Sequence, residues 1–227
     1  MTILSKVISK VISKVKTLIE YAKFGMGVSA MWRGKAVDEL FIAKGINSIG
    51  FGNGFGKGAM RDYAKAINMP YVTYMTGSKT LQTNEVVEKV TAPKVTVFER
   101  NDYFYHAYGL KELYLDSCIK ASDYLFCNCK NLQILKLGAL NESTNTAFMG
   151  CGALHTLIVG EGTAANLFIQ YSSLLTQECM HNIIDNVADR IGTSALTLYV
   201  HQDVYDRISE EYKTKLSQKN WNLAVKS

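Results

Sequence analysis

The sequence predicts an α/β fold: a short solenoid of stacked 22-residue units with a helical C-terminal cap, preceded by an amphipathic N-terminal helix and a Gly-rich, β-containing region. Two patterns predict this class: an apolar repeat in the second half of the chain and a lysine-striped segment at its start. The repeat consists of three apolar series that share one constant interval, namely Leu110, Leu132 and Leu154; Leu113, Leu135 and Leu157; and Leu115, Leu137 and Val159.

Aromatic and thiol side chains keep the same interval further along each unit. It separates Phe104 from Phe126, Phe126 from Phe148, and Cys129 from Cys151. A single unit of this kind cannot bury its apolar edge alone, whereas stacked units share a continuous core. Such a fold offers a surface to a partner and does not by itself supply chemistry.

Three regions follow from these patterns: 1–24, an assembly or anchoring helix; 25–84, a Gly-rich anchoring or oligomerisation region; and 85–227, the repeat domain with its C-terminal cap. In the repeat domain we expect strands at Lys94–Phe98, Glu112–Asp116, Ile134–Gly138 and His155–Gly160. A helix from Thr176 as N-cap to Gly192, a strand at 195–201, a helix at Asp203–Gln218 and a strand at 221–225 then complete the chain. This altered last unit suits the closure of the open core.

Residues 3–23 have the pattern of an amphipathic helix, with lysines on the polar face. An isolated helix of this kind is marginal in water, so something must cover its apolar stripe. Packing on the chain's own middle region, self-association or docking into a larger assembly, and lying flat on a membrane all remain open; we expect an assembly role. The stripe comprises Leu4, Val7, Ile8, Val11, Ile12, Val15, Leu18 and Ile19.

The Gly-rich middle region contains two partial nucleotide-binding patterns. Gly54, Gly56 and Ala59 match G-x-G-x-x-A, but the preceding segment is itself Gly-rich and no acidic residue follows at the required distance. A phosphate loop would need a glycine where Phe51 stands and a hydroxyl residue where Gly58 stands. No cofactor is therefore expected. We expect turns or bulges in a β-rich element, and a short helix at 59–68 that Pro70 prevents from continuing.

Charge is concentrated at the start of the chain. Residues 1–61 hold ten Lys/Arg and three Asp/Glu, a balance of +7, while residues 62–227 hold fifteen and seventeen, a balance of −2. The basic end favours an acidic partner, a membrane face or an acidic capsid surface, and nucleic-acid binding is not expected. No uninterrupted apolar stretch of about 18 residues occurs, so no transmembrane segment is predicted. Lysine at every fourth position also breaks up the apolar core of a cleaved leader.

Cysteine and histidine spacing predicts neither a metal site nor an active site. The five cysteines lack C-x-x-C spacing and are expected to be buried thiols, with a Cys129–Cys151 disulfide as the alternative. None of the four histidines has H-x-x-x-H spacing. Cys179 and His181 would face different sides of one helix, which disfavours a nucleophile pair. We therefore predict no enzyme and no metal.

The segment 101–108, NDYFYHAY, is the strongest candidate for ligand binding. The repeat assigns Phe104 to the core, so its polar-tipped neighbours could form an exposed stacking platform for a sugar or a peptide. The alternative is that these side chains pack beneath an irregular first coil. The candidate residues are Tyr103, Tyr105, His106 and Tyr108.

The combination of L-x-x-L-x-L with F-x-x-C resembles the BspA-like leucine-rich repeats over roughly residues 95–227. It is carried by ELYLDSC…YLFCNC, ILKLGAL…TAFMGC and TLIVGEG, with Leu125-Phe126 where that family favours Ala-Phe. The segment that begins SSLLTQECM and ends at KNWNLA looks like the closing segment of such repeats in proteins of gut Bacteroidetes and their bacteriophages. The resemblance implies surface recognition or virion architecture.

We therefore expect a non-enzymatic bacteriophage virion structural protein, of the head-fibre, capsid-decoration or tail-fibre type. Its N-terminal part would bind other virion proteins or itself as a homo-oligomer such as a trimer. Its repeats would recognise a host-surface glycan or protein. The alternative is a leucine-rich-repeat adhesin on a bacterial cell surface.

Overall fold

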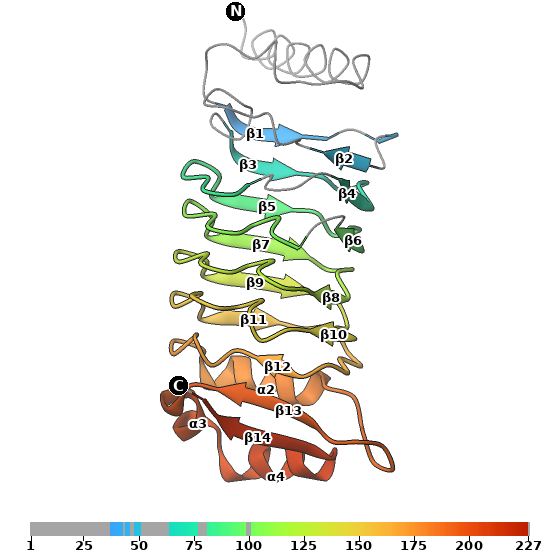
Figure 1. The fold of residues 1–227 in the computed structure, drawn as a ribbon, viewed down its shortest axis with the longest axis vertical. Helices are drawn as coiled ribbons and strands as arrows, with labels where there is room; N and C mark the ends of the chain where they lie inside the picture. Colours follow the sequence, from blue (N-terminus) through green and yellow to red (C-terminus); the bar gives the residue numbers. More distant parts are fainter. Residues whose placement is uncertain are drawn as a thin grey trace, which may run out of the picture.

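The structure, a computed structural model, describes residues 37–42, 44–45, 48–50, 64–76, 81–98 and 101–226. The chain advances through successive coils whose strands lie one beside another (Figure 1). The strands are β1 (Val37–Phe41), β2 (Ser48–Gly50), β3 (Ala64–Asn68), β4 (Tyr74–Thr76), β5 (Lys89–Thr91), β6 (Val97–Phe98), β7 (Glu112–Leu115), β8 (Lys120–Ala121), β9 (Ile134–Leu137), β10 (Glu142–Ser143), β11 (Thr156–Ile158), β12 (Leu167–Phe168), β13 (Leu196–Val200) and β14 (Trp221–Val225). The helices are α2 (Gln177–Asn186), α3 (Gln202–Arg207) and α4 (Glu210–Gln218).

The main sheet has six strands in the order β1-β3-β5-β7-β9-β11, and all of its pairs are parallel. Leu113 is the register partner of Leu135, and Leu135 is the partner of Leu157. Leucines that are one repeat interval apart therefore lie side by side in adjacent strands, as the repeat predicts.

Short strands form the other side of the stack. They make the parallel sheets β2-β4-β6 and β8-β10, and the strands β12-β13-β14 form a separate parallel sheet at the C-terminal end. Figure 1 shows β2, β4, β6, β8 and β10 one below another along one side of the molecule. The coils that contain β3, β5, β7 and β9 thus each contribute one strand to the main sheet and one to this second side. The coil of β11 instead runs on into the C-terminal β12-β13-β14 sheet.

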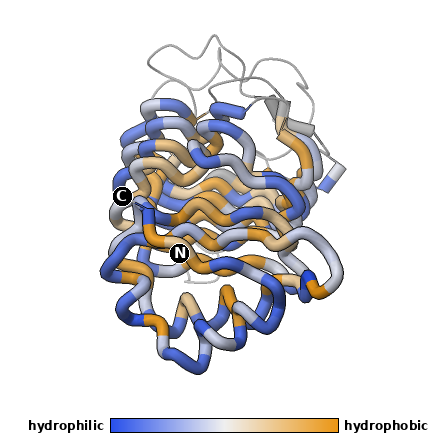
Figure 2. The backbone as a smooth tube through the Cα atoms, turned by 60° about the horizontal axis from the view of Figure 1, so that its bottom comes forward, coloured by the Kyte–Doolittle hydropathy of each residue, from blue (hydrophilic) through white to orange (hydrophobic). Residues whose placement is uncertain are grey.

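The core between these layers is apolar and closely packed. The three leucine series are at most 1% exposed, and the hydrophobic stretches of the chain run through the middle of the coils (Figure 2). The rings of Phe104, Phe126 and Phe148 are also fully buried, with centroids 6.0 and 5.6 Å apart along the stack. Burial of one such side chain contributes about 1.5–3 kcal/mol, so the repeat accounts for most of the stability of these coils.

The solenoid begins earlier than the sequence patterns predict. The main sheet continues without a break across the expected boundary at 84/85, because β1 and β3 belong to it. Positions that leucines hold in later coils are occupied here by other buried apolar side chains. These are Ala64, Ile67 and Met69 in one coil and Val87, Val90 and Ala92 in the next. Apolar side chains other than leucine can fill these places because each coil is sandwiched between two others.

Two element predictions in this part of the chain are therefore wrong. Residues 64–68 form strand β3 and not the end of a helix. The main-sheet strand of the next coil is Lys89–Thr91, whereas Val97–Phe98 belongs to the second side. In both cases hydrogen bonds to neighbouring strands outweigh the local pattern.

One turn position repeats a left-handed backbone in four successive coils. Thr83, His106, Asn128 and Gly150 have φ values of 56°, 59°, 58° and 75°. The backbone nitrogens of His106 and Asn128 donate to the carbonyls of Cys127 and Met149 in the next coil, at 2.9 and 2.6 Å. Glycine is favoured at the last position, because a Cβ on Gly150 would lie 2.3 Å from Oδ1 of Asn128.

Helix α2 runs along the last strand of the main sheet. Its N-cap is Thr176, as predicted, but it ends at Asn186 and not at Gly192. Sγ of Cys179 lies 3.2 Å from both the backbone nitrogen and the carbonyl oxygen of Leu157, and Nδ2 of Asn186 donates to the carbonyl of Val159 at 3.0 Å. Side chains of α2 thus bond to the edge that a further strand would occupy.

The predicted helix at 203–218 is two helices in the structure. Helix α3 ends at Arg207, and Ser209 becomes the N-cap of α4, accepting from the backbone nitrogen of Tyr212. Lys219, which follows α4, donates through Nζ to the carbonyls of Ile184, Asp185 and Val187 at 3.0, 2.7 and 2.9 Å. These bonds satisfy the carbonyls at the end of α2 and fix α4 beside it.

Candidate interaction face

The outward side of the main sheet presents side chains from every strand. In each L-x-x-L-x-L unit the leucines point into the core and the intervening residues point outward. Register brings these outward residues into two rows that cross the sheet. The first row contains Glu39, Ala66, Lys89, Glu112, Ile134 and Thr156, and the second contains Phe41, Asn68, Thr91, Tyr114, Lys136 and Ile158. We call these residues the sheet face.

Ion pairs connect neighbouring coils on the sheet face. Nζ of Lys89 lies 2.6 Å from Oε2 of Glu112, which also accepts from the Tyr114 hydroxyl at 3.1 Å. The hydrogen bond between Lys89 and Glu112 raises the pKa of Lys89 and lowers the pKa of Glu112. Burial raises the pKa of the Tyr114 hydroxyl. These groups are partly exposed, so each pair contributes at most about 1 kcal/mol to folding and mainly sets the polarity of the surface.

The sheet face becomes more apolar toward β9 and β11. Ile134 and Ile158 are half-buried there. Ile134 lies on the strand next to the half-buried Tyr114, and Lys136 separates Tyr114 from Ile158 in the second row. Lys136 lies in the same row as Tyr114 and forms an ion pair with Asp116. A surface that mixes aliphatic and aromatic side chains with paired charges suits contact with a protein.

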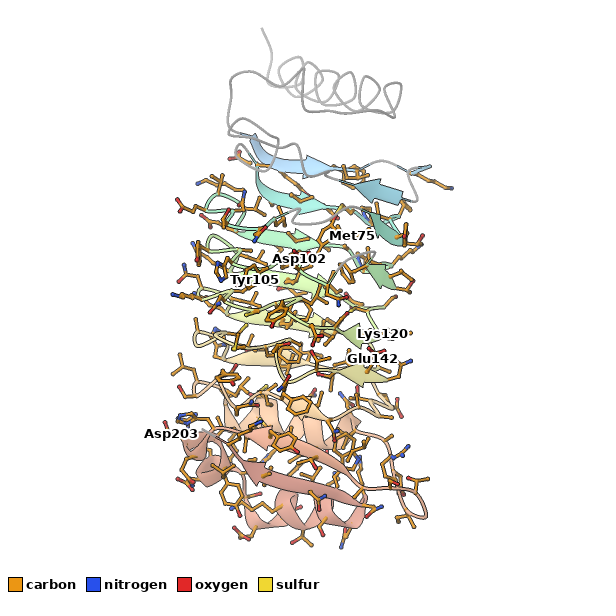
Figure 3. All side chains as sticks on the ribbon, in the orientation of Figure 1. Met75, Asp102, Tyr105, Lys120, Glu142 and Asp203 are labelled. Atoms are coloured by element: carbon orange, nitrogen blue, oxygen red, sulfur yellow. The ribbon has the colours of Figure 1, made fainter. Side chains whose placement is uncertain are left out.

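The second side of the stack also carries an ion pair between coils. Lys120 of β8 and Glu142 of β10 come from adjacent coils and form an ion pair at 2.8 Å (Figure 3). Both side chains are at least half exposed. Charges on this side are therefore paired between coils, as they are on the sheet face.

Tyr103, predicted to be part of an exposed platform, is fully buried. Its ring packs edge-on against Phe98 and Phe104, with centroids 5.5 Å away in both cases. The prediction fails because position 103 precedes the Phe104 anchor on the inner turn of the coil, where Leu125 and Ala147 are also buried in later coils. Tyr103 therefore cannot contact a ligand from the surface.

The other three predicted residues lie together and are half-buried. The ring of His106 stacks on Tyr105 at 3.9 Å and on Tyr108 at 5.4 Å (Figure 3 labels Tyr105). Nδ1 of His106 is 3.1 Å from the Tyr108 hydroxyl, and Nε2 is 2.9 Å from Nδ2 of Asn128. Each of the three rings is stacked on at least one of the others, so they do not form the fully open platform that was predicted.

The cysteines are buried free thiols in the structure. All five belong to the core, and none forms a disulfide. Burial raises the pKa of Cys118 and Cys179 to about 11 and the pKa of Cys151 to about 12, and it raises the pKa of Cys129 well above its usual value. Cys129 and Cys151 donate to the carbonyls of Phe104 and Phe126 at 3.0 and 3.1 Å. A buried thiol with a raised pKa stays protonated at neutral pH, which disfavours its action as a nucleophile.

Histidines do not gather into a site in the part of the chain that the structure describes. Cys179 contacts β11, whereas the ring of His181 stacks on Tyr212 of α4 at 3.6 Å, so the two face different neighbours as predicted. No group of three or more metal-binding side chains occurs among the described residues. No helix among them is long and apolar enough to cross a membrane.

The predicted assembly stripe lies outside the described residues. Its members, from Leu4 to Ile19, precede Val37, where the described part of the chain begins. The sheet face, in contrast, is well described but was not predicted from the sequence. The signal was present, because the positions between the leucines of each L-x-x-L-x-L unit are outward by the geometry of a strand.

Comparison with known proteins shows the fold. No model of a known protein family matches the chain, and no curated protein matches it. Among solved structures, the chain is similar to the crystal structure of a leucine-rich repeat protein from T. pallidum, with a TM-score of 0.54 and 14% sequence identity. The match covers 85% of this chain and 88% of that one. The chain thus has a leucine-rich-repeat fold.

Proposed function

We propose that this chain is a non-enzymatic scaffold that binds a protein partner through its sheet face. The observation that carries the proposal is the six-stranded parallel sheet, whose outward rows combine Tyr114, Ile134 and Ile158 with paired charges. Leucine-rich-repeat folds generally serve as interaction scaffolds, and a rigid surface of this kind loses little entropy when it binds.

Two finer assignments belong to the same proposal. We assign the units to the BspA-like subtype, supported by the constant register of β7, β9 and β11 and by the matching thiol bonds of Cys129 and Cys151. We also assign α2 as a cap of the core, supported by its bonds to Leu157 and Val159. A cap is needed because the last coil would otherwise expose its apolar edge.

We further propose that the chain is a virion component of a bacteriophage, of the head-fibre, capsid-decoration or tail-fibre type. Support comes from the resemblance of the closing segment and from the +7 charge of residues 1–61, which suits an acidic capsid surface. Residues 1–24 would provide the assembly contact. Tyr105, His106 and Tyr108 are proposed as a secondary contact for a host glycan or peptide.

Mass spectrometry of purified virions tests the proposed location. We expect the chain in particles that withstand high-salt washing, and deletion of residues 1–24 should remove it from them while the repeat domain stays folded. Detection on intact bacteria that carry no phage, together with absence from virions, would favour the adhesin alternative and overturn the virion proposal.

Substitutions on the sheet face test the binding surface itself. Tyr114→Ala combined with Ile134→Asp should abolish cross-linking to the partner, with an unchanged fold because both residues are half-exposed. The control is Leu174→Asp, which alters an apolar side chain that is 54% exposed elsewhere. Retained cross-linking in the double variant, or equal loss in the control, would place the binding surface elsewhere.

A further inference from the structure

The two sheets that reach the C-terminal end of the molecule finish differently. At the main sheet, Cys179 and Asn186 of α2 bond to the backbone of Leu157 and Val159, and the backbone nitrogen of Thr176 donates to the carbonyl of His155 at 3.4 Å. Hydrogen-bonding groups of the β11 edge are thus occupied. The other sheet ends at β14, which is the last strand in the order β12-β13-β14.

Strand β14 is an intact strand with an open edge. All five of its residues pair in register with β13, from Trp221 opposite Leu196 to Val225 opposite Val200. At its outer side no strand pairs with it among the described residues. Both lysines of α4 bond elsewhere, Lys215 with Asp185 of α2 and Lys213 with Glu210 within α4. Figure 1 shows β14 as the strand farthest from β1, with α4 beside it at that end of the molecule.

The direction of the free groups follows from one hydrogen bond. The backbone nitrogen of Lys226 donates to the carbonyl of Val200 at 3.1 Å. Successive residues of a strand direct their backbone groups to alternate sides, so Lys226, Ala224 and Asn222 bond toward β13. The N–H and C=O groups of Trp221, Leu223 and Val225 therefore point outward along the open edge.

Nothing in the strand protects this edge. Natural proteins blunt edge strands with proline, bulges or inward-pointing charges. The sequence WNLAV contains no proline and no charge, and the first charged residue is Lys226, beyond the strand. Apolar side chains flank the edge as well: Val225 is 43% exposed at its end, and Ile191 is 70% exposed near its start. Asn220 holds the Ile191 loop there through bonds from Nδ2 to the carbonyls of Arg190 and Thr193, at 3.1 and 2.8 Å.

We propose that β14 pairs with β14 of a second copy of this chain, antiparallel and about a two-fold axis that passes through Leu223. Antiparallel pairing then sets Leu223 opposite Leu223 and Trp221 opposite Val225, so each outward residue exchanges its N–H and C=O bonds with one opposite it. Parallel pairing in register would instead place Lys226 beside Lys226.

The same arrangement buries the exposed apolar side chains. Val225 of one copy comes to the start of β14 in the other copy, where Ile191 lies. Lys226 comes opposite Asn220, so no like charges meet. The strand is therefore complementary to itself in this orientation, which is the reason for choosing a second copy over an unrelated extended peptide.

A disulfide across the proposed axis tests the pairing directly. In a hydrogen-bonded antiparallel pair the Cα atoms are about 5.5 Å apart, within reach of a disulfide. Full-length chain with Leu223→Cys should form a covalent homodimer on mild oxidation, whereas Leu174→Cys should not. The natural cysteines do not interfere, because all five are buried. The readout is independent of any association through residues 1–24. Absence of the Leu223→Cys dimer, or linkage to another protein in its place, would overturn the proposal.

Val225→Pro supplies a second measurement. Proline removes an outward N–H of the edge and leaves the bond from Lys226 to Val200 in place. We expect the variant to melt like the wild type and its Leu223→Cys form to cross-link roughly tenfold more slowly. An unchanged cross-linking rate in a folded variant would show that the contact does not use this edge.

Discussion

The coils of β7, β9 and β11 and the earlier coils of β3 and β5 occupy equivalent places in one sheet with different side chains. The later coils carry leucine at nearly all of the inward positions and keep the 22-residue interval that separates Glu112 from Ile134. The earlier ones carry Ala64, Ile67 and Met69 or their Val and Ala counterparts, and their interval is one residue longer, as between Ala66 and Lys89. A coil is thus specified by its neighbours' hydrogen bonds and by inward apolar spacing, and less by leucine itself.

Placing a charge in the leucine series should have the largest effect. Leu135→Asp should lower the free energy of unfolding by about 4 kcal/mol or more, because the carboxylate would be buried among Leu113 and Leu157 without a partner. Thermal denaturation measures the loss. The control is Gln133→Asp, an exposed position two residues earlier, which should melt like the wild type. A wild-type melting temperature for Leu135→Asp would contradict the burial of these leucines in one core that the two sets of coils share.

Truncating the aromatic column should separate the two sets of coils. Phe126→Ala should cost about 3–5 kcal/mol, since Phe104 and Phe148 lie against both sides of the ring. Leu81 holds the equivalent place in the earlier coil, because its backbone nitrogen donates to the carbonyl of Tyr103 as that of Phe104 donates to Leu125. Leu81→Ala should cost less, about 2–4 kcal/mol. Chemical denaturation would measure both, and a larger loss at Leu81 would reverse the proposed order.

Substitution of the glycine at the left-handed turn position should destabilise the later coils. Gly150→Ala should destabilise the protein by about 1–3 kcal/mol, since the new Cβ is strained at a positive φ and meets Asn128. Gly152→Ala serves as control, because no heavy atom lies within 4 Å of its added Cβ. It should change the denaturation midpoint little. Equal effects at the two glycines would contradict the account of the turn.

A glycine at the equivalent position of the earlier coil should stabilise the protein. Thr83 is β-branched at a φ of 56°, a conformation that costs an L-residue about 1–2 kcal/mol. Thr83→Gly removes that strain but adds about 0.5–1 kcal/mol of backbone entropy loss on folding. The net stabilisation should be about 0.5–1 kcal/mol, observed as a higher denaturation midpoint. A lower midpoint would mean that the Thr83 side chain stabilises the fold by more than the strain of its backbone conformation costs.

Periodicity identified the later coils because their inward residues are nearly identical. Leu113, Leu135 and Leu157 recur at a constant interval, and the strands near them were predicted to within two positions at either end. The earlier coils escaped because Ala64 and Val87 do not look like Leu110, and because the interval between them changes. The interval is longer again between β1 and β3, where Val37 pairs with Ala64, and this hides the first coil further.

The candidate site was predicted less well than the fold. Tyr103 and Tyr105 are close in sequence, yet one lies in the core and the other nearer the surface. That difference depends on the path of the turn before Phe104, for which one irregular unit offers no repeated pattern. The sheet face could have been found, since strand geometry alone turns Tyr114 and Ile134 outward.

The amino-acid sequence was sufficient to specify the stacked architecture, the buried thiols and the start of α2, because apolar periodicity and capping are local and repeat along the chain. It was not sufficient to show where the solenoid begins, which aromatic residues stay at the surface, or that α2 occupies the β11 edge while β14 leaves its own edge open. The folded chain settles these points through pairing between distant segments, such as β3 with β5 and β12 with β13, and no single segment reveals its partner.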